Sequence, residues 1–260
     1  MFPFATRVET HAIIGSTMDR ARELAEAGAP EGTLVLADAQ TAGRGTGGRR
    51  WLSPPGTQLA LTLIVRPALE GAHLPRLTMW IGLALLTAVR ARLARPDLAQ
   101  LKWPNDLLID GRKAAGILVE GAFGQGRLRY ALIGVGLNLA AAPPDDAVEY
   151  PATHLAAHAT TPGTRDDVLR DFLSALALDY PAVLFDAELA SRWRAALWWP
   201  LEPVSLDLGA ERIVGRLSGV TAAGALIVET DQGARTLETG RLRPMAAGPY
   251  NADEGGPSDV

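Results

Sequence analysis

The chain has 260 residues, of which 48% are apolar and 21% charged, a balance typical of a globular protein with a substantial core. This length suits one medium-sized domain and a small second one. The formal net charge of −4 argues against a dedicated nucleic-acid binder. The absence of cysteine excludes disulfide bonds, a cysteine nucleophile and thiolate metal sites.

Neither a signal peptide nor a membrane span is predicted. The first ten residues, MFPFATRVET, lack a basic segment followed by a long apolar one. The most apolar long segment, residues 74–93, carries Arg76, Arg90 and Arg92 and has helical periodicity, which favours a buried amphipathic helix. The four histidines show no spacing typical of a metal site. We therefore expect a soluble, cytoplasmic protein.

The first third of the chain predicts helices and strands in alternation. Ser16 precedes an amphipathic stretch and is expected to cap a helix, with Asp19 completing a capping box. Residues 33–37 form a compact apolar run typical of a buried strand. A second apolar strand is predicted over residues 58–66 and should end at the proline that follows it. A core helix is predicted over residues 74–94.

A glycine- and arginine-rich loop follows the first buried strand. Residues 38–51 read DAQTAGRGTGGRRW, and every residue from Gly43 to Arg50 except Thr46 is glycine or arginine. Free backbone N–H groups and fixed positive charge favour the binding of a phosphate or carboxylate. The pattern alone fits an ordinary surface turn equally well.

Residues 102–106 read KWPND and begin a predicted hairpin. Pro104 should end a strand, and Asp110-Gly111 is a tight-turn signal before the next one. Asp106 and Lys113 therefore lie on one hairpin, where a carboxylate and an ammonium could share a cleft. The alternative is a surface salt bridge worth about 0–1 kcal/mol.

Residues 128–138 read LRYALIGVGLN and predict a strand. Gly134 and Gly136 are alternate residues, so they share a face and leave room for a flat ligand against the backbone. The alternative is that the missing side chains accommodate a bulge or local packing. We favour ligand clearance.

The remainder predicts a loop, two helices and a second unit. Residues 140–164 lack periodicity, and amphipathic helices are predicted over 165–184 and 186–197, with Pro181 breaking or kinking the first. A boundary is expected near residues 199–203. Beyond it, short alternating strands predict a small barrel; these are residues 204–208, 212–217, 225–230 and 234–238. We divide the chain into residues 1–200, residues 201–247 and a tail over 248–260 that composition predicts to be disordered.

Taken together, the glycine–arginine loop, KWPND with Lys113, GVGLN at residues 134–138 and the Ser16-Thr17 pair resemble the biotin protein ligases. The motifs occur in the family's order over residues 10–245. The resemblance is to the short type without a DNA-binding helix-turn-helix, because the Ser16 motif begins close to the N-terminus. It implies an α+β fold: a mixed-sheet, SH2-like biotin/lipoate ligase catalytic domain followed by an SH3-like barrel.

The resemblance also implies the reaction and the partners. Biotin is activated with ATP and Mg²⁺ to biotinyl-5′-AMP, with release of pyrophosphate. Biotin is then transferred to a lysine of the biotin carboxyl carrier domain of a biotin-dependent carboxylase. No DNA or membrane partner is expected. Family members often dimerise through the catalytic-domain sheet, so the resemblance allows a homodimer.

Site roles follow residue by residue from the same resemblance. Lys113 would neutralise the carboxylate and α-phosphate, Asp106 would orient the chemistry and steer the carrier lysine, and Arg44 would assist. The biotin-binding set is Ser16, Thr17, Gln40, Gly43, Arg44, Lys113, Gly116, Gly134 and Gly136. The ATP- and adenylate-binding set is Arg44, Gly45, Thr46, Arg49, Trp51, Lys102, Asn105, Lys113 and Asn138, with Asn138 also placed near Mg²⁺.

The sequence departs from the family's pattern in two places. Met18 stands where the family's Ser-Thr-Asn triplet has asparagine, which removes one polar group. Thr46 and Gly47 replace loop arginines, the first of which helps to hold the adenylate. Losing such a cation predicts release of the adenylate roughly 10- to 100-fold faster, unless Arg49 or Arg50 compensates.

Two other functions are compatible with these motifs. One is a lipoate or octanoate protein ligase or transferase, which shares the catalytic fold. The other is a binding module for biotin or nucleotide that has lost catalysis, as the missing loop arginines suggest. The presence of both Asp106 and Lys113 argues against the second.

Overall fold

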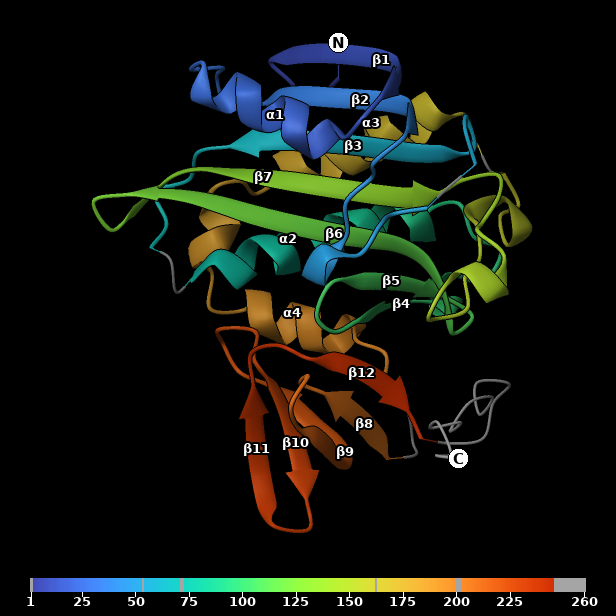
Figure 1. Cartoon of the computed structure of the whole chain (residues 1–260), viewed down its shortest axis with the longest axis vertical. Coiled ribbons are helices and arrows are strands. Elements are labelled where there is room, and N and C mark those ends of the chain that lie inside the picture. Colours follow the sequence, from blue (N-terminus) through green and yellow to red (C-terminus); the bar gives the residue numbers. More distant parts are fainter. Residues whose placement is uncertain (1, 53, 71–72, 162, 200–202, 246–260) are drawn as a thin grey trace, which may run out of the picture. The chain divides into compact units, whose positions relative to one another are not determined.

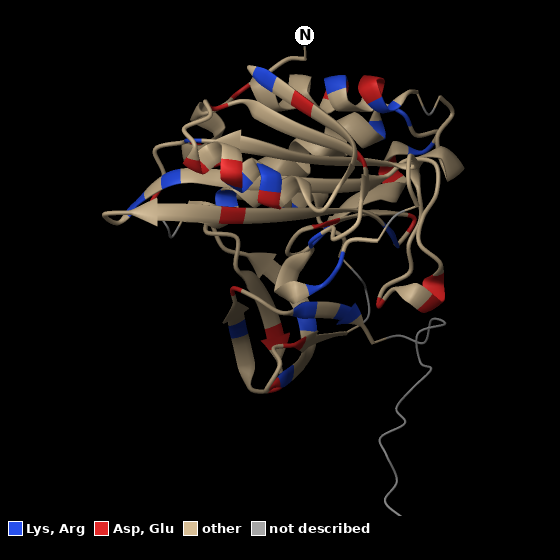
Figure 2. Cartoon of the chain, turned by 45° about the horizontal axis from the view of Figure 1, so that its top comes forward, with Lys and Arg blue, Asp and Glu red and all other residues tan. Residues whose placement is uncertain are grey.

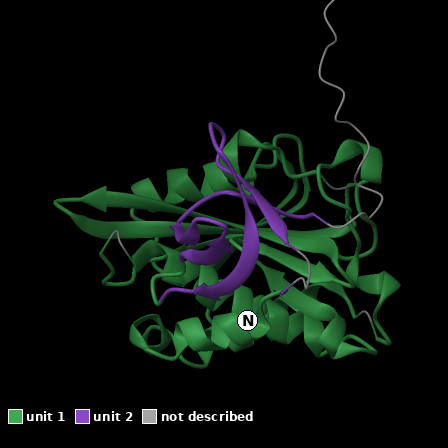
Figure 3. Ribbon diagram, turned by 90° about the horizontal axis from the view of Figure 1, so that it is seen from below, with its two compact units in different colours: residues 1–198, 222–224 green, residues 199–221, 225–260 purple. Residues whose placement is uncertain are grey.

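The computed structural model describes residues 2–52, 54–70, 73–161, 163–199 and 203–245. The chain divides into two compact units, which are coloured separately in Figure 3. Unit 1 comprises Met1–Trp198 with Ala222–Gly224, and unit 2 comprises Trp199–Thr221 with Ala225–Val260. The tail that composition predicts to be disordered lies outside the described residues.

Unit 1 contains a mixed seven-stranded sheet in the order β1-β2-β3-β7-β6-β5-β4 (Figure 1). Only β1 and β2 pair in parallel, and every other neighbouring pair is antiparallel. The α+β prediction with a mixed sheet is therefore confirmed. The strands are β1 Arg7–Ile14, β2 Thr33–Gln40, β3 Gln58–Val65, β4 Ala99–Lys102, β5 Asp106–Ile109, β6 Arg112–Gly124 and β7 Arg127–Asn138.

Helices cover both faces of this sheet. Helix α1 crosses one face, α2 and α3 lie behind the other, and α4 packs against α2 (Figure 1). The helices are α1 Thr17–Glu26, α2 Leu74–Arg90, α3 Arg165–Ala177 and α4 Leu189–Ala196, with 3₁₀ turns η1 Thr46–Gly48, η3 Pro96–Leu98, η4 Asp145–Ala147, η5 Leu155–Ala157 and η6 Ala182–Phe185. None of the helices in the described ranges has the length and apolar character needed to cross a bilayer.

The helix predicted over residues 165–184 is wrong at its C-terminal end. It stops at Ala177, and a separate 3₁₀ turn follows before α4. Pro181 explains the end point, because proline has no N–H to donate to the carbonyl four residues earlier, which is that of Ala177. The second predicted helix likewise begins three residues late, at Leu189.

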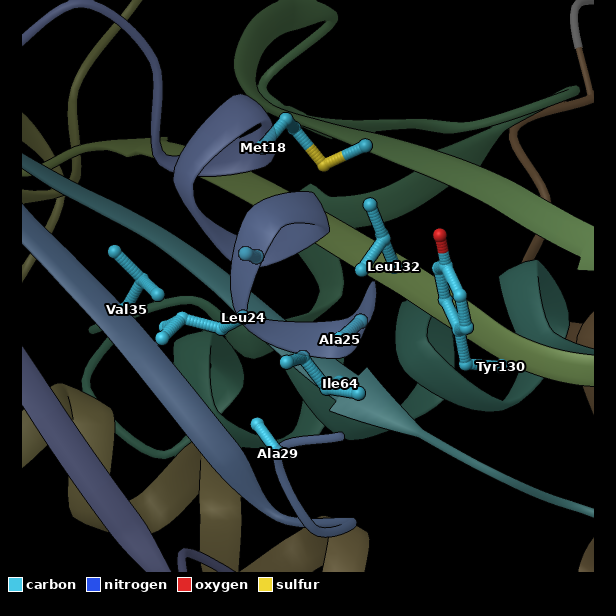
Figure 4. Close-up of a cluster of buried hydrophobic side chains, with 9 residues drawn as sticks. Met18, Leu24, Ala25, Ala29, Val35, Ile64, Tyr130 and Leu132 are labelled. Atoms are coloured by element: carbon cyan, nitrogen blue, oxygen red, sulfur yellow. The ribbon is translucent and has the colours of Figure 1, made fainter. Parts of the chain in front are cut away.

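Helix α1 is fixed by its cap and by one apolar face. Ser16 is the N-cap, and its hydroxyl accepts from the Met18 N–H at 3.2 Å, as predicted. Asp19 does not complete the capping box, since its carboxylate accepts from Arg44 instead. Figure 4 shows the apolar face of α1 packed over β2, β3 and β7; the buried cluster is Met18, Ala21, Leu24, Ala25, Ala29, Val35, Ile64, Tyr130 and Leu132.

A polar region lies on the same face of the sheet as this apolar cluster, farther along the strands. Asp106 pairs with Gly116, Gly116 with Gly136, and Gln58 with Asn138. Directly paired residues of antiparallel strands point to the same face. One face of the sheet is therefore covered by α1 at one end of the strands and carries small and polar residues at the other end of the strands.

Surface charges of both signs are interspersed over unit 1 (Figure 2). Many form ion pairs, such as Arg20 with Glu9 at 2.6 Å and Arg112 with Asp145 at 2.7 Å. Such pairing balances the surface charge locally.

Unit 2 is a five-stranded antiparallel sheet in the order β11-β10-β9-β8-β12. Its strands are β8 Val204–Asp207, β9 Arg212–Val220, β10 Leu226–Thr230, β11 Gly233–Leu237 and β12 Arg241–Pro244. The first four match the predicted strands, whereas β12 was not predicted. Among the described residues β11 and β12 form the two edges of this sheet. The strands expected for the SH3-like unit are therefore present, but their hydrogen bonding does not close into a barrel.

Candidate active site

The β5–β6 hairpin places a carboxylate and two ammonium groups together. A β-bulge between Leu107 and Leu108 shifts the register, so that Asp106 pairs with Gly116 while Leu108 pairs with Lys113. Gly116 and Lys113 are an odd number of residues apart and would otherwise point to opposite faces. The bulge therefore brings Lys113 to the same face as Asp106.

The resulting cluster is compact and largely buried. The Asp106 Oδ1 lies 2.6 Å from the Lys113 Nζ, and its Oδ2 lies 3.6 Å from the Lys102 Nζ. The side chains of Lys102, Asp106 and Lys113 are 8%, 12% and 28% exposed, respectively. Asp106 and Lys113, predicted to lie on one hairpin, are thus in direct contact. Because both are largely buried, water screens their attraction less than it screens a surface salt bridge.

Burial and charge act against each other on the pKa values of this cluster. Burial opposes the charged form of Asp106, but the positive charges of Lys113 and Lys102 outweigh it and hold the pKa of the carboxyl below its usual range. For Lys102 burial is the largest effect and lowers the pKa of the ammonium, against the attraction of Asp106. Asp106 therefore stays ionised at neutral pH. The three groups together hold more positive than negative charge, as an anionic ligand requires.

The segment after β7 forms one wall of the cluster. The Lys113 N–H donates to the Pro151 carbonyl at 2.7 Å, and the Thr153 N–H donates to the Lys113 carbonyl at 2.9 Å. The Tyr150 ring lies 4.9 Å from the Lys102 Nζ, a cation–π distance. Sequence reasoning missed Tyr150, because nothing in the irregular stretch 140–164 indicates which residue meets the hairpin.

The helix N-terminus and the end of β2 form a second polar group. The Gln40 Oε1 accepts from the Thr17 N–H at 2.9 Å and from the Thr17 hydroxyl at 3.1 Å. The Thr62 hydroxyl donates to the Thr17 hydroxyl at 2.9 Å. The predicted pocket residues Ser16, Thr17 and Gln40 thus lie together. Thr62 was missed, although its place in the strand alternation with Gln58 could have indicated it.

The glycines of β6 and β7 accommodate the chain's own side chains in this structure. A methyl group at Gly136 would overlap the Trp51 indole, and one at Gly134 would lie 2.8 Å from the Met18 Sδ. The Trp51 Nε1 donates to the Gln58 Oε1 at 2.9 Å, which fixes the indole. These contacts agree with the packing alternative, and clearance for a ligand at the two glycines stays a prediction. The indole becomes a wall of the site, with the Lys113 Nζ 5.8 Å from its ring.

Arg44 and Arg49 of the arginine loop contact different parts of the chain. The Arg44 guanidinium donates to Asp19 at 2.9 Å and to Glu120 at 2.6 Å, so it ties the loop to α1 and β6. Arg49 donates to Thr46 and to Glu149. The catalytic role of Arg44 stays a prediction, but in this structure its guanidinium is engaged by two carboxylates.

Three further predicted residues make contacts within their own hairpin or loop. The Asn105 Nδ2 donates to the Ile117 carbonyl at 2.6 Å, so its side chain stabilises the hairpin. Gly43 approaches Trp51 closely, and its carbonyl accepts from the Trp51 N–H at 2.9 Å. Gly45 donates its N–H to the Arg49 carbonyl at 2.8 Å.

Asn138 is the predicted contact for Mg²⁺. Its Nδ2 donates to the Thr153 carbonyl at 3.0 Å, while its buried Oδ1 accepts from no group among the described residues. An unpaired amide oxygen suits Mg²⁺, which nevertheless requires several oxygen ligands. Within the described ranges, no group of three or more His, Cys, Asp or Glu residues could hold a metal ion. The residues fit Mg²⁺ that arrives on ATP phosphates, with Asn138 as a single protein ligand.

The fold and the site define an α+β protein whose sheet carries a cationic site for an anionic ligand. Comparison with known proteins then gives the family. The profile of the biotin/lipoate A/B protein ligase family matches residues 11–138. The bifunctional ligase/repressor BirA of Bacillus subtilis is 32% identical over 237 residues, which cover 87% of this chain and 70% of the relative. The biotin–[acetyl-CoA-carboxylase] ligase of Paracoccus denitrificans is 34% identical over 215 residues, covering 78% and 86%.

A solved structure has the same architecture. The biotin protein ligase from Aquifex aeolicus in complex with biotin and ATP superposes with a TM-score of 0.72 at 25% identity, covering 92% of this chain and 99% of that one. The chain belongs to the biotin/lipoate A/B protein ligase family, and two of the proteins named above, from Paracoccus and Aquifex, are named as biotin ligases. The resemblance read from the motifs is therefore confirmed.

Proposed function

We propose that the chain is a biotin protein ligase that forms biotinyl-5′-AMP from biotin and ATP and then transfers biotin to a lysine of a biotin carboxyl carrier domain. The observation that supports this most directly is the Asp106–Lys113 contact of 2.6 Å. It lies on the face of the sheet that α1 covers. The family relationship supplies the substrates. The biotin–[acetyl-CoA-carboxylase] ligase of Paracoccus and the biotin protein ligase of Aquifex favour biotin over lipoate as the substrate.

The first half-reaction joins two anions, so the site must supply positive charge. A biotin carboxylate oxygen attacks the α-phosphorus of ATP, and the bond from that phosphorus to the bridging oxygen of pyrophosphate breaks. Lys113 would lie against the carboxylate and the α-phosphate oxygens, where its charge offsets the repulsion between them. Bound Mg²⁺ would neutralise part of the remaining phosphate charge, with Asn138 as the residue to hold it.

In the second half-reaction the carrier lysine amine attacks the biotinyl carbonyl carbon, and AMP leaves with the bond electrons. The amine loses a proton as the amide forms, and this proton passes to the Asp106 carboxylate or to solvent. Asp106 is ionised and could accept a hydrogen bond from the incoming amine once Lys113 has turned to the ligand. We assign Asp106 to orienting the amine and Lys113, and the group around Thr17 and Gln40 to binding the biotin head group.

The carrier would be a carboxylase domain, since the relative from Paracoccus is named for acetyl-CoA carboxylase. We expect the protein to act in the cytoplasm without DNA or membrane partners, and a homodimer through the sheet stays a prediction.

The test is biotin-dependent exchange of labelled pyrophosphate into ATP. Exchange with biotin, but not with lipoate or octanoate, is expected, and Lys113→Ala should abolish it while the protein stays folded. Exchange with lipoate alone would favour the lipoate alternative. The absence of exchange with all three acids would favour a binding module. Normal exchange in the variant would refute the role of Lys113.

A further inference from the structure

The loop at the family's arginine positions forms a tight turn in this chain. The turn η1 reverses the chain, and the Gly45 N–H donates to the Arg49 carbonyl at 2.8 Å. The backbones of Arg44 and Arg50 pair as an isolated antiparallel β-bridge. Gly47 and Gly48 have φ angles of 63° and 76°, in the left-handed region that favours glycine. An arginine at either position would strain this turn.

Thr46, which replaces a family arginine, holds the side chain of Arg49. The Arg49 Nε donates to the Thr46 carbonyl at 3.0 Å, and the Arg49 Nη2 donates to the Thr46 hydroxyl at 2.7 Å. Two bonds from one guanidinium to one residue fix its plane as well as its position. The third contact, from Nη1 to the Glu149 Oε2, is longer, at 3.4 Å.

Through Glu149, Arg49 lies next to the segment that covers the Lys102–Asp106–Lys113 cluster. Glu149 is followed directly by Tyr150, the residue whose ring covers the Lys102 Nζ. Burial raises the pKa of the Asp106 carboxyl, the two lysines lower it most, and the positive charge of Arg49 lowers it further. Arg44, by contrast, is paired with carboxylates on α1 and β6. Of Arg44 and Arg49, only Arg49 acts on the pKa of Asp106 among the causes found for that group.

We propose that Thr46 is a positioning residue, which holds the Arg49 guanidinium toward the adenylate phosphate so that Arg49 replaces the missing arginine cation. This rests on the proposed function, because it names the group that retains the intermediate of that reaction. The Arg49 Nη1 donates to Glu149 only weakly, at 3.4 Å, so a phosphate, which is a stronger acceptor, can take the place of this carboxylate. The adenylate is then retained despite the loss of arginine at positions 46 and 47.

The experiment measures release of preformed, labelled biotinyl-5′-AMP from the whole protein after a chase with unlabelled biotin and ATP. Arg49→Gln should speed release about 10- to 100-fold, the equivalent of one charge-assisted hydrogen bond. Thr46→Val, which keeps the shape and removes the hydroxyl, should speed release roughly 3- to 10-fold. Thr46→Ser should restore slow release. Arg50→Gln is the matched control, because the Arg50 guanidinium donates to the Thr41 carbonyl instead.

The double variant distinguishes positioning from a separate structural effect. If Thr46 acts through Arg49, then Thr46→Val combined with Arg49→Gln releases the adenylate no faster than Arg49→Gln alone. Multiplying effects, or wild-type release in either single variant, would overturn the proposal. If the wild-type protein forms no adenylate from biotin and ATP, the proposed function itself fails, and the role of Thr46 with it. An adenylate that forms normally but is released independently of Thr46 overturns only the positioning role.

Discussion

Replacing Asp106 by asparagine should lower the free energy of unfolding by about 3 kcal/mol at neutral pH. The substitution keeps the shape of the side chain but removes the negative charge between Lys102 and Lys113, which lie 3.6 and 2.6 Å from its two oxygens. Breaking a buried ion pair costs roughly 3–5 kcal/mol, because the remaining charge stays desolvated. We take the lower end, because Lys113 is 28% exposed and the amide oxygen can still accept one hydrogen bond. Adenylation should fall by about 100-fold or more.

Urea denaturation followed by circular dichroism, together with pyrophosphate exchange, checks both effects. The matched control is Asp106→Asn combined with Lys102→Met, which removes the buried cation as well as its partner. Because no unpaired ammonium then remains on β4, this double variant should regain more than half of the lost stability but none of the activity. A wild-type urea midpoint for Asp106→Asn, or a double variant less stable than the single one, would refute the reasoning.

Three further changes test other parts of the structure. Gly136→Ala should displace the indole that lies against it and lower stability by about 1–3 kcal/mol, whereas Gly219→Ala, whose nearest contact would be an ordinary 3.4 Å, should not; equal melting temperatures would contradict this. Glu9→Gln should lower stability by about 1 kcal/mol at pH 7. Its hydrogen bond with Arg20 lowers the pKa of Glu9 from 4.5 to about 2, so this contribution is present above pH 4.5 and is lost as the pH falls through 2; an effect that persists below pH 2 would disprove the assignment. Met18→Asn, which restores the family residue, should destabilise the protein by about 2 kcal/mol, because it places an amide in an apolar cluster; an unchanged urea midpoint would show that the amide finds partners there.

Local signals in the sequence determined much of the secondary structure and the identity of the site. The apolar run after residue 32, the Asp110-Gly111 turn and the Ser16 cap each act through neighbouring residues, so each could be predicted. The motif residues likewise gave the family and placed Asp106 and Lys113 on one hairpin. The edge strands β1 and β12 were not predicted, because their sequences carry weaker apolar patterns and depend on pairing with distant strands.

Only the tertiary structure decided which side chains meet. The bulge beside Leu108 turns Lys113 toward Asp106, and no local pattern marks a register shift that depends on two strands. The spaces at Gly134 and Gly136 are filled by Met18 and Trp51, which come from distant parts of the chain. A sequence determines local backbone preferences and the available chemical groups, whereas contacts between remote residues follow from strand register and from packing of the whole sheet.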